Sequence, residues 1–163
     1  MKIEKANIKD ALEIANIEKI CFPPLEAASF ESIKERITVF KNHFFVLKDN
    51  DIIIGFINGM VTDSENLSDD MYEDANLHNE NGLWQMVFGI DIIPKYQGKG
   101  YAGMLIRHFI NVAKNENRNG IVLTCKENLV PFYEHFGFCN EGISQSEHGG
   151  VRWYQMRLVF DKK

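Results

Sequence analysis

Cysteine is scarce in this sequence, and its three cysteines, Cys21, Cys125 and Cys139, are odd in number and widely spaced. They form neither a disulfide framework nor the close pairs that bind zinc or iron–sulfur clusters. Such usage is typical of a reducing compartment, so we expect a cytoplasmic location. A buried structural role is the commoner one for isolated cysteines, and a role as thiol nucleophile stays open for each of them.

An excess of basic residues, long apolar runs and internal repeats are also absent from the sequence. With 18 basic and 23 acidic residues the formal net charge is −5, which argues against a protein that binds nucleic acid through phosphate contacts. The N-terminus, Met-Lys-Ile-Glu-Lys, lacks the apolar segment of a signal peptide. The apolar runs are shorter than the roughly 20 residues of a membrane span. We therefore expect one domain over residues 1–163, with neither a nucleic-acid nor a membrane partner.

Hydrophobic periodicity and turn residues predict alternating strands and helices. The expected strands cover residues 2–5, 43–47, 52–61, 83–93 and 121–125, and two more flank the Gly149-Gly150 turn. Four helices are expected. The first ends before Pro23 and buries Ile8, Ala11, Leu12 and Ala15, and the second begins at Ser29 and buries Phe30, Ile33, Ile37 and Phe40. The third has Ala102, Leu105, Phe109 and Val112 on its inner stripe, and the fourth is short and capped by Asn128.

The order of these elements is β-α-α-β-β-β-α-β-α-β-β. A strand-helix-strand unit implies parallel neighbours, and the hairpins imply antiparallel ones. We therefore predict an α/β (mixed α+β) fold with a central mixed, mostly antiparallel sheet and helices on both faces. Residues 62–81 are acidic and polar, and we expect them to form a mobile or substrate-side loop.

The segment between the strand at 83–93 and the helix that follows carries the strongest functional signal. It reads Gln97-Gly98-Lys99-Gly100-Tyr101-Ala102. A helix that begins directly after a glycine turn offers unpaired N–H groups and a positive dipole end, which suit a phosphate group. The spacing fits neither the Walker loop nor the dinucleotide fingerprint. Taken alone, the motif is equally compatible with a plain strand-turn-helix junction.

Gln-x-x-Gly-x-Ala after such a strand resembles the pyrophosphate loop of the GNAT N-acetyltransferases. The segment Leu129-Val-Pro-Phe-Tyr-Glu-His-Phe-Gly-Phe138 resembles a second coenzyme-binding segment of the arylalkylamine N-acetyltransferases. The segments Ile17–Ser29 and His148–Tyr154 are similar to substrate-side parts of bacterial members of that group. The resemblance spans nearly the whole chain, and the predicted order of elements also matches the GNAT fold.

The resemblance implies acetyl-coenzyme A as cosubstrate and a small-molecule amine as acceptor. It implies direct attack by the amine on the thioester, with Tyr133 as the general acid that protonates the departing thiolate; a phenol with a pKa near ~10 is suited to that task. Without the resemblance, Tyr133 reads as a core aromatic residue. The residues implied in coenzyme binding are Ile90, Asp91, Ile92, Gln97, Gly98, Lys99, Gly100, Tyr101 and Ala102, together with Asn128 and Phe132.

The general base is where the sequence departs from the family. Vertebrate arylalkylamine enzymes have two histidines on the strand before the turn, and Met86 and Phe88 stand at those positions. Glu26, in the loop expected beside the amine, is the candidate base, although a solvated loop glutamate fits equally well. His78 and His148 are less specific candidates, and we expect His43 at the surface or at a strand edge. No histidine pair has a metal-like spacing, so no metal is predicted.

The predicted function is that of an acetyl-CoA-dependent N-acetyltransferase acting on a primary amine such as an aromatic ethylamine or a polyamine. One alternative is a protein lysine or N-terminal acetyltransferase, for which the acidic segment from Asp63 to Glu80 could receive a cationic peptide. Another is a non-catalytic acyl-CoA-binding regulatory module. The sequence leaves open whether the protein is a monomer or a homodimer.

Overall fold

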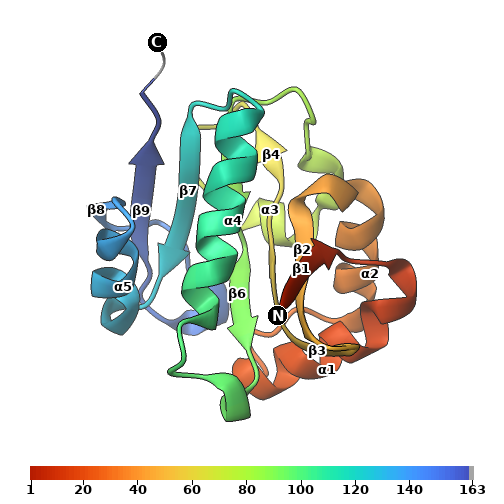
Figure 1. The fold of residues 1–163 in the computed structure, drawn as a ribbon. Coiled ribbons are helices and arrows are strands. Elements are labelled where there is room, and N and C mark those ends of the chain that lie inside the picture. Colours follow the sequence, from red (N-terminus) through yellow and green to blue (C-terminus); the bar gives the residue numbers. More distant parts are fainter. Residues whose placement is uncertain (162–163) are drawn as a thin grey trace.

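The computed structural model describes residues 1–161, which form nine strands, five α-helices and several 3-10 turns (Figure 1). The strands are β1 (Lys2–Lys5), β2 (Phe44–Asp49), β3 (Ile52–Asn58), β4 (Val61–Thr62), β5 (Trp84–Val87), β6 (Gly89–Ile92), β7 (Gly120–Cys125), β8 (Cys139–Ile143) and β9 (Tyr154–Val159). The helices are α1 (Ala11–Cys21), α2 (Phe30–Val39), α3 (Asp70–Glu73), α4 (Tyr101–Asn115) and α5 (Val130–His135). Within residues 1–161, no helix has the length and apolar character that crossing a membrane requires.

The strands form two sheets rather than one. The first has the order β1-β2-β3-β6 and is antiparallel throughout. The second has the order β4-β5-β7-β9-β8, in which only β5 and β7 run parallel. The predicted mixed, mostly antiparallel character is confirmed, but the predicted single strand at 83–93 is divided between the two sheets as β5 and β6.

The division occurs at Phe88, and the buried side chain of Gln85 stabilises it. Its amide nitrogen lies 3.0, 3.2 and 2.8 Å from the carbonyl oxygens of Gly59, Met60 and Met86. These carbonyl groups lie where the chain passes from one sheet to the other, between β3 and β4 and between β5 and β6. The Met60 carbonyl also accepts the Met86 amide at 2.8 Å. Because buried backbone carbonyl groups need partners, the glutamine amide supplies hydrogen bonds where the ladder is interrupted.

Helices cover both faces of the first sheet, as predicted. Phe45 and Leu47 of β2 pack in one core cluster with Leu105 and Phe109 of α4. The alternate strand residues, including Phe44 and Val46, pack against α1 and α2 in a second cluster. This alternation is the two-residue period of a strand buried on both sides. In Figure 1, α4 lies in front of the strands, while α1 and α2 lie on the side of β1 to β3.

Several local predictions need correction. Ala11 and Ala15 are buried as predicted, but Ile8 and Leu12 are 51% and 61% exposed, because α1 turns Ile14 and Ile17 inward in their place. Asn128 lies within a 3-10 turn, Glu127–Leu129, and does not cap α5. The expected loop at 62–81 contains α3 and a 3-10 turn, Ala75–Leu77, anchored by the buried Leu67, Met71 and Ala75.

Candidate active site

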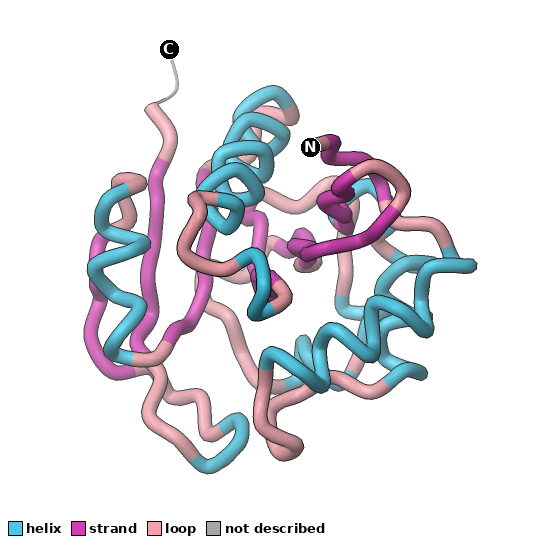
Figure 2. The backbone as a smooth tube through the Cα atoms, turned by 60° about the horizontal axis from the view of Figure 1, so that its bottom comes forward, coloured by secondary structure: helices cyan, strands magenta, loops and turns pink. Residues whose placement is uncertain are grey.

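A cavity of about 370 Å³ opens where the two sheets separate. The strands β6 and β7 are not paired with each other, and Gly89, Ile90, Thr124 and Cys125 line the cavity from the two sides. The loop between α1 and α2, the helices α3 and α5 and the β8–β9 connection complete the wall. Figure 2 shows the β8–β9 connection beside the loop between α1 and α2, although these segments are far apart in the sequence.

The predicted phosphate loop lies at the end of β6 and leads directly into α4. Gly98 and Gly100 have φ angles of +76° and +87°, and a Cβ atom at either position would meet no atom within 4 Å. For the described residues, no backbone acceptor meets the amide groups from Gly98 to Gly103. The start of this 15-residue helix therefore presents free N–H groups to an open surface.

The open edge of β6 carries the three strand residues implied in coenzyme binding. Phe88 and Ile93 donate their N–H groups to Asn58 and Ile54 of the neighbouring chain segment at 2.7 and 2.9 Å. Asn58 pairs with Gly89 in the register of β6, so the Phe88 bond lies outside the regular ladder. Counted back from Ile93, antiparallel alternation directs the backbone groups of Asp91 towards β3, and those of Ile90 and Ile92 towards the gap. The Ile92 carbonyl already accepts the side-chain amide of Gln97 at 2.8 Å. Free N–H groups at Ile90 and Ile92 are thus available in the gap, while Asp91 is turned away from it.

Tyr133 lies on α5 and lines the cavity opposite β6. It is 7% exposed, and it packs edge-to-face against Phe132 and Phe138. Burial, followed by the charges of neighbouring groups such as Cys125 and Asp91, raises the pKa of the Tyr133 phenol above its ordinary value. The hydroxyl group therefore keeps its proton at neutral pH, as a proton donor must.

Glu26 lies in the loop between α1 and α2 and also lines the cavity. The structure does not place it in solvent: it is 7% exposed, and its carboxylate oxygens lie 2.9 and 3.0 Å from Nζ of Lys126. Its backbone carbonyl contacts Nε2 of His148 at 2.9 Å. Gly149 packs directly against the Glu26 side chain, since a Cβ atom there would lie 2.5 Å from Cγ of Glu26.

A series of aromatic rings forms the wall of the cavity away from the phosphate loop. The rings of Phe88 and Tyr72 have centroids 4.8 Å apart, and Tyr72 stacks on His148 at 4.8 Å and an interplanar angle of 11°. Trp153 follows at 6.0 Å from His148. Asp69, which precedes α3, accepts hydrogen bonds from the Ser146 hydroxyl and the Glu147 amide. Asp69 belongs to the acidic segment 62–81, which we call the acidic insertion. The acidic insertion and the β8–β9 connection are thereby held together over the cavity.

Two buried charged residues that line the cavity, Glu18 and Arg36, were missed from the sequence. Glu18 lines the cavity and accepts the amide of Ala28 at 2.7 Å. The carboxyl group of Asp91 lies against Glu18; burial first, and the negative charge of Glu18 second, raise its pKa well above the ordinary value and favour its protonated form. Arg36 of α2, 6% exposed, lies over the Phe88 ring at 4.8 Å. Glu18 and Arg36 fall on the buried stripes of α1 and α2. Their helical spacing from the apolar residues of those stripes is the sequence signal that could have identified them as buried.

The structure separates other predicted residues from the cavity. Asn128 is exposed in its turn, and Phe132 packs against Tyr133 and Phe136 behind the cavity wall. Trp153 lines the cavity, whereas Trp84 and Phe30 belong to separate core clusters.

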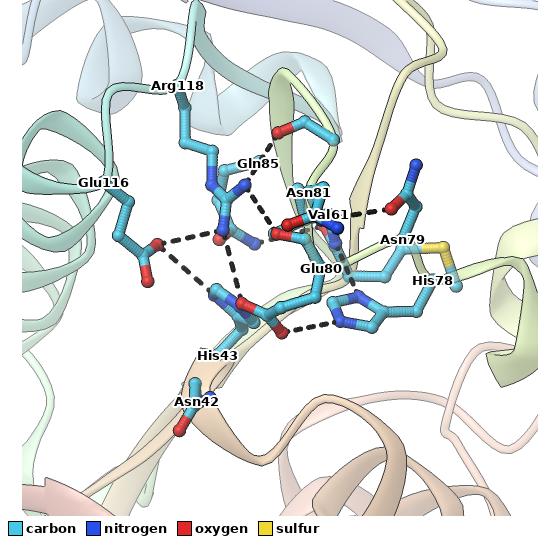
Figure 3. Close-up of polar contacts among 12 residues, drawn as sticks. Asn42, His43, Val61, His78, Asn79, Glu80, Asn81, Gln85, Glu116 and Arg118 are labelled. Carbon is cyan, nitrogen blue, oxygen red and sulfur yellow. Dashed lines mark hydrogen bonds and ion pairs between the residues drawn. The ribbon is translucent and has the colours of Figure 1, made fainter.

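A second polar cluster lies outside the cavity, where the acidic insertion returns to β5 (Figure 3). Glu80 contacts Nε2 of His43 at 2.8 Å, Nε2 of His78 at 2.9 Å and the Arg118 guanidinium at 3.3 Å. His43 directly precedes β2 and is fully buried, so of its two predicted positions, surface or strand edge, the surface one is wrong. The amide of Val61 donates to Nδ1 of His78, so Nε2 of that ring carries the hydrogen. The His43-His78-Glu80 group thus fits a hydrogen-bond network better than a metal site, which would need a lone pair on that nitrogen.

Comparison with known proteins gives a consistent result. The family model described as "Acetyltransferase (GNAT) domain" matches residues 15–160. Serotonin N-acetyltransferase of Mesocricetus auratus is 27% identical over 154 residues, which cover 91% of this chain and 72% of that protein.

Two solved structures show the same fold. A GNAT-like decarboxylase, GphF, in complex with isobutyryl-CoA superposes with a TM-score of 0.85 at 15% identity, covering 98% of this chain and 99% of the other. A GNAT family acetyltransferase from Brucella melitensis in complex with acetyl-CoA gives a TM-score of 0.62 at 17% identity, covering 99% of this chain and 88% of the other.

Proposed function

The chain belongs to the acetyltransferase (GNAT) domain family, and from this premise we propose that it transfers the acetyl group of acetyl-coenzyme A to a primary amine, with Tyr133 as general acid. The observation that carries the proposal is the cavity between β6 and β7, which has a protonated buried phenol on one side and free strand amides on the other. Acetyl-coenzyme A supplies the activated thioester for this reaction.

The residues at the end of β6 fit the coenzyme. The amides from Gly98 to Gly103 lack backbone acceptors, and they lie at the positive end of the α4 dipole, which suits a diphosphate. We assign the loop Gln97–Ala102 to this diphosphate. We assign the N–H groups of Ile90 and Ile92 to the acyl-pantetheine arm and to the oxyanion that forms in the reaction.

Tyr133 and Glu26 divide the proton transfers in this proposal. The acceptor amine must lose its proton before attack, because an alkylammonium with a pKa near ~10.4 is charged at neutral pH. Glu26 lines the same cavity and is the proposed base or ammonium-binding group, although its carboxylate is shared with Lys126. The raised pKa of Tyr133 keeps the phenol protonated for transfer to the departing thiolate.

Tyr133→Phe tests the proposal because it removes only the hydroxyl group. We expect kcat to fall about 10²- to 10⁴-fold, the usual contribution of a positioned general acid, while calorimetry shows unchanged coenzyme A affinity. Tyr154→Phe, on β9, is the matched control and should retain activity. Full activity of Tyr133→Phe would contradict the general-acid role.

The same assay separates the other functions. Coenzyme A binding without acetylation of any amine or peptide would indicate an acyl-CoA-binding module. Acetylation of peptides alone would indicate a protein acetyltransferase. Loss of carbon dioxide from a dicarboxylic acyl thioester, without any amine, would indicate decarboxylation, the activity named for the similar GphF structure. Each of these results would contradict transfer to a small amine.

A further inference from the structure

Arg36 is a buried cation that has no carboxylate partner. It lies one turn after Ile33 on the inner stripe of α2 and is 6% exposed. Its hydrogen bonds go to neutral acceptors, the Asn58 amide oxygen at 3.3 Å and the Tyr72 carbonyl at 3.5 Å, and both are long. Among the ion pairs of residues 1–161, none includes Arg36. Buried charges are normally paired, so this guanidinium is an exception.

The nearby acids do not pair directly with it. The Glu18 carboxylate is engaged with the Ala28 amide, and Asp91 lies against Glu18, where burial and that charge raise its pKa. Both act on Arg36 only at longer range. Burial lowers the pKa of Arg36, but a guanidinium remains charged in proteins. Arg36 also lines the cavity, so its remaining donors lie beside the space that a substrate would occupy.

We propose that Arg36 binds a carboxylate group of the small-molecule substrate, and that this carboxylate belongs to the acceptor, which is an amino acid rather than a simple amine. The planar fork of a guanidinium matches a carboxylate with two parallel hydrogen bonds. Glu26, the proposed base or ammonium-binding group, lines the same cavity and would face the acceptor ammonium. The aromatic wall of Phe88, Tyr72 and Trp153 suits a planar side chain. This inference rests on the proposed acetyl transfer.

Matched acceptor pairs test the inference, because an amino acid and its decarboxylated amine differ only in the carboxylate. Phenylalanine with phenethylamine, and tryptophan with tryptamine, are compared by thiol release from acetyl-coenzyme A. We expect a higher kcat/KM for the amino acid of each pair. Arg36→Met should lower that value about 10- to 100-fold, the usual effect of losing a hydrogen bond to a charged group, and should change the amine little. Arg36→Lys should retain an intermediate preference.

Arg157→Met is the matched control. Arg157 also lies over an aromatic ring, that of Trp84 at 4.9 Å, but it is outside the cavity and paired with Glu141. Arg157→Met should leave the preference for the amino acid over the amine unchanged. If Arg36→Met does not fold, the wild-type preference and the Arg36→Lys variant still decide the question.

Several outcomes would overturn the inference. One is a higher kcat/KM of the wild-type protein for the amine of each pair. Another is a kcat/KM that falls equally for the amino acid and the amine in Arg36→Met. A preference for succinyl- over acetyl-coenzyme A that disappears in Arg36→Met would assign the carboxylate to the acyl group instead. If no acceptor is acetylated, the proposed function fails. A thermal shift with N-acetylphenylalanine, but not with N-acetylphenethylamine, would still support carboxylate binding, and equal shifts would refute it.

Discussion

At the scale of single residues, Gly149 and Gly150 differ in what their missing side chains would contact. Their φ angles are +67° and +71°, so a side chain at either position strains the backbone. At Gly150 a Cβ atom would meet nothing within 4 Å, whereas at Gly149 it would lie 2.5 Å from Cγ of Glu26. Since Lys126 holds the Glu26 carboxylate, Glu26 cannot move aside freely.

This difference makes a controlled pair of variants. We expect Gly150→Ala to lower the free energy of unfolding by about 1 kcal/mol through backbone strain alone. Gly149→Ala should cost about 2 to 3 kcal/mol, because overpacking adds to the same strain, and it should also lower kcat/KM by displacing Glu26. Urea unfolding and initial rates measure the two effects. Equal stability and equal rates in the two variants would show that Gly149 does not position Glu26.

At the scale of elements, the change of sheet at Phe88 depends on Gln85. Its amide nitrogen contacts the carbonyl groups of Gly59, Met60 and Met86 at the point where the ladder is interrupted. Gln85→Glu keeps the shape but replaces the donor by an acceptor. We expect this variant to lose about 2 to 4 kcal/mol of unfolding free energy, from unsatisfied buried groups and carboxylate burial. Chemical denaturation measures it.

The control for this prediction is Gln145→Glu, an exposed residue of the β8–β9 connection, which should change stability by less than about 0.5 kcal/mol. A Gln85→Glu variant as stable as this control would mean that the carbonyl groups find other partners.

Most elements could be predicted from the sequence because their signals are local. Ser29 caps α2 through the Ser32 amide, and α4 begins after the glycine turn as its periodicity indicated. The change of sheet within residues 83–93 could not be predicted, since Met86 and Val87 before Phe88 and Ile90 and Ile92 after it all suit a buried strand. It depends on contacts of Gln85 with residues that are distant in sequence.

The candidate site was predictable only in part. The turn residues Gln97 to Ala102 follow a local pattern, and Tyr133 follows a family resemblance. Arg36 and Glu18 were not predicted as site residues, because a charged residue on a helix is normally solvated. Only the tertiary structure shows that both are buried. Tyr72 escaped because its acidic surroundings indicated a loop, whereas Met71 beside it is buried and anchors α3.

At the scale of the whole molecule, the two sheets are connected but not paired where β6 and β7 diverge. A ligand that bridges this gap binds only the folded protein and must therefore stabilise it. At coenzyme A concentrations 100 times the Kd, the gain is about 2.7 kcal/mol, which corresponds to a rise in Tm of about 5 to 10 °C for a chain of this size. Thermal denaturation with and without coenzyme A measures it.

Gly100→Ala and Gly142→Ala localise this effect. Their φ angles are +87° and +91°, and neither Cβ atom would meet another atom within 4 Å. Both variants should lower the Tm of the free protein similarly. Only Gly100→Ala, at the start of α4, should also reduce the rise caused by coenzyme A. An equal rise in both variants would place the diphosphate elsewhere.

The stacked rings of Tyr72 and His148 have a consequence for engineering. One ring comes from the acidic insertion and the other from the β8–β9 connection, and Asp69 ties the two segments together. Neither segment completes the aromatic wall alone. Grafting one of them from a relative would leave a folded scaffold with a broken specificity surface, so acceptor range has to be exchanged by transplanting both segments together.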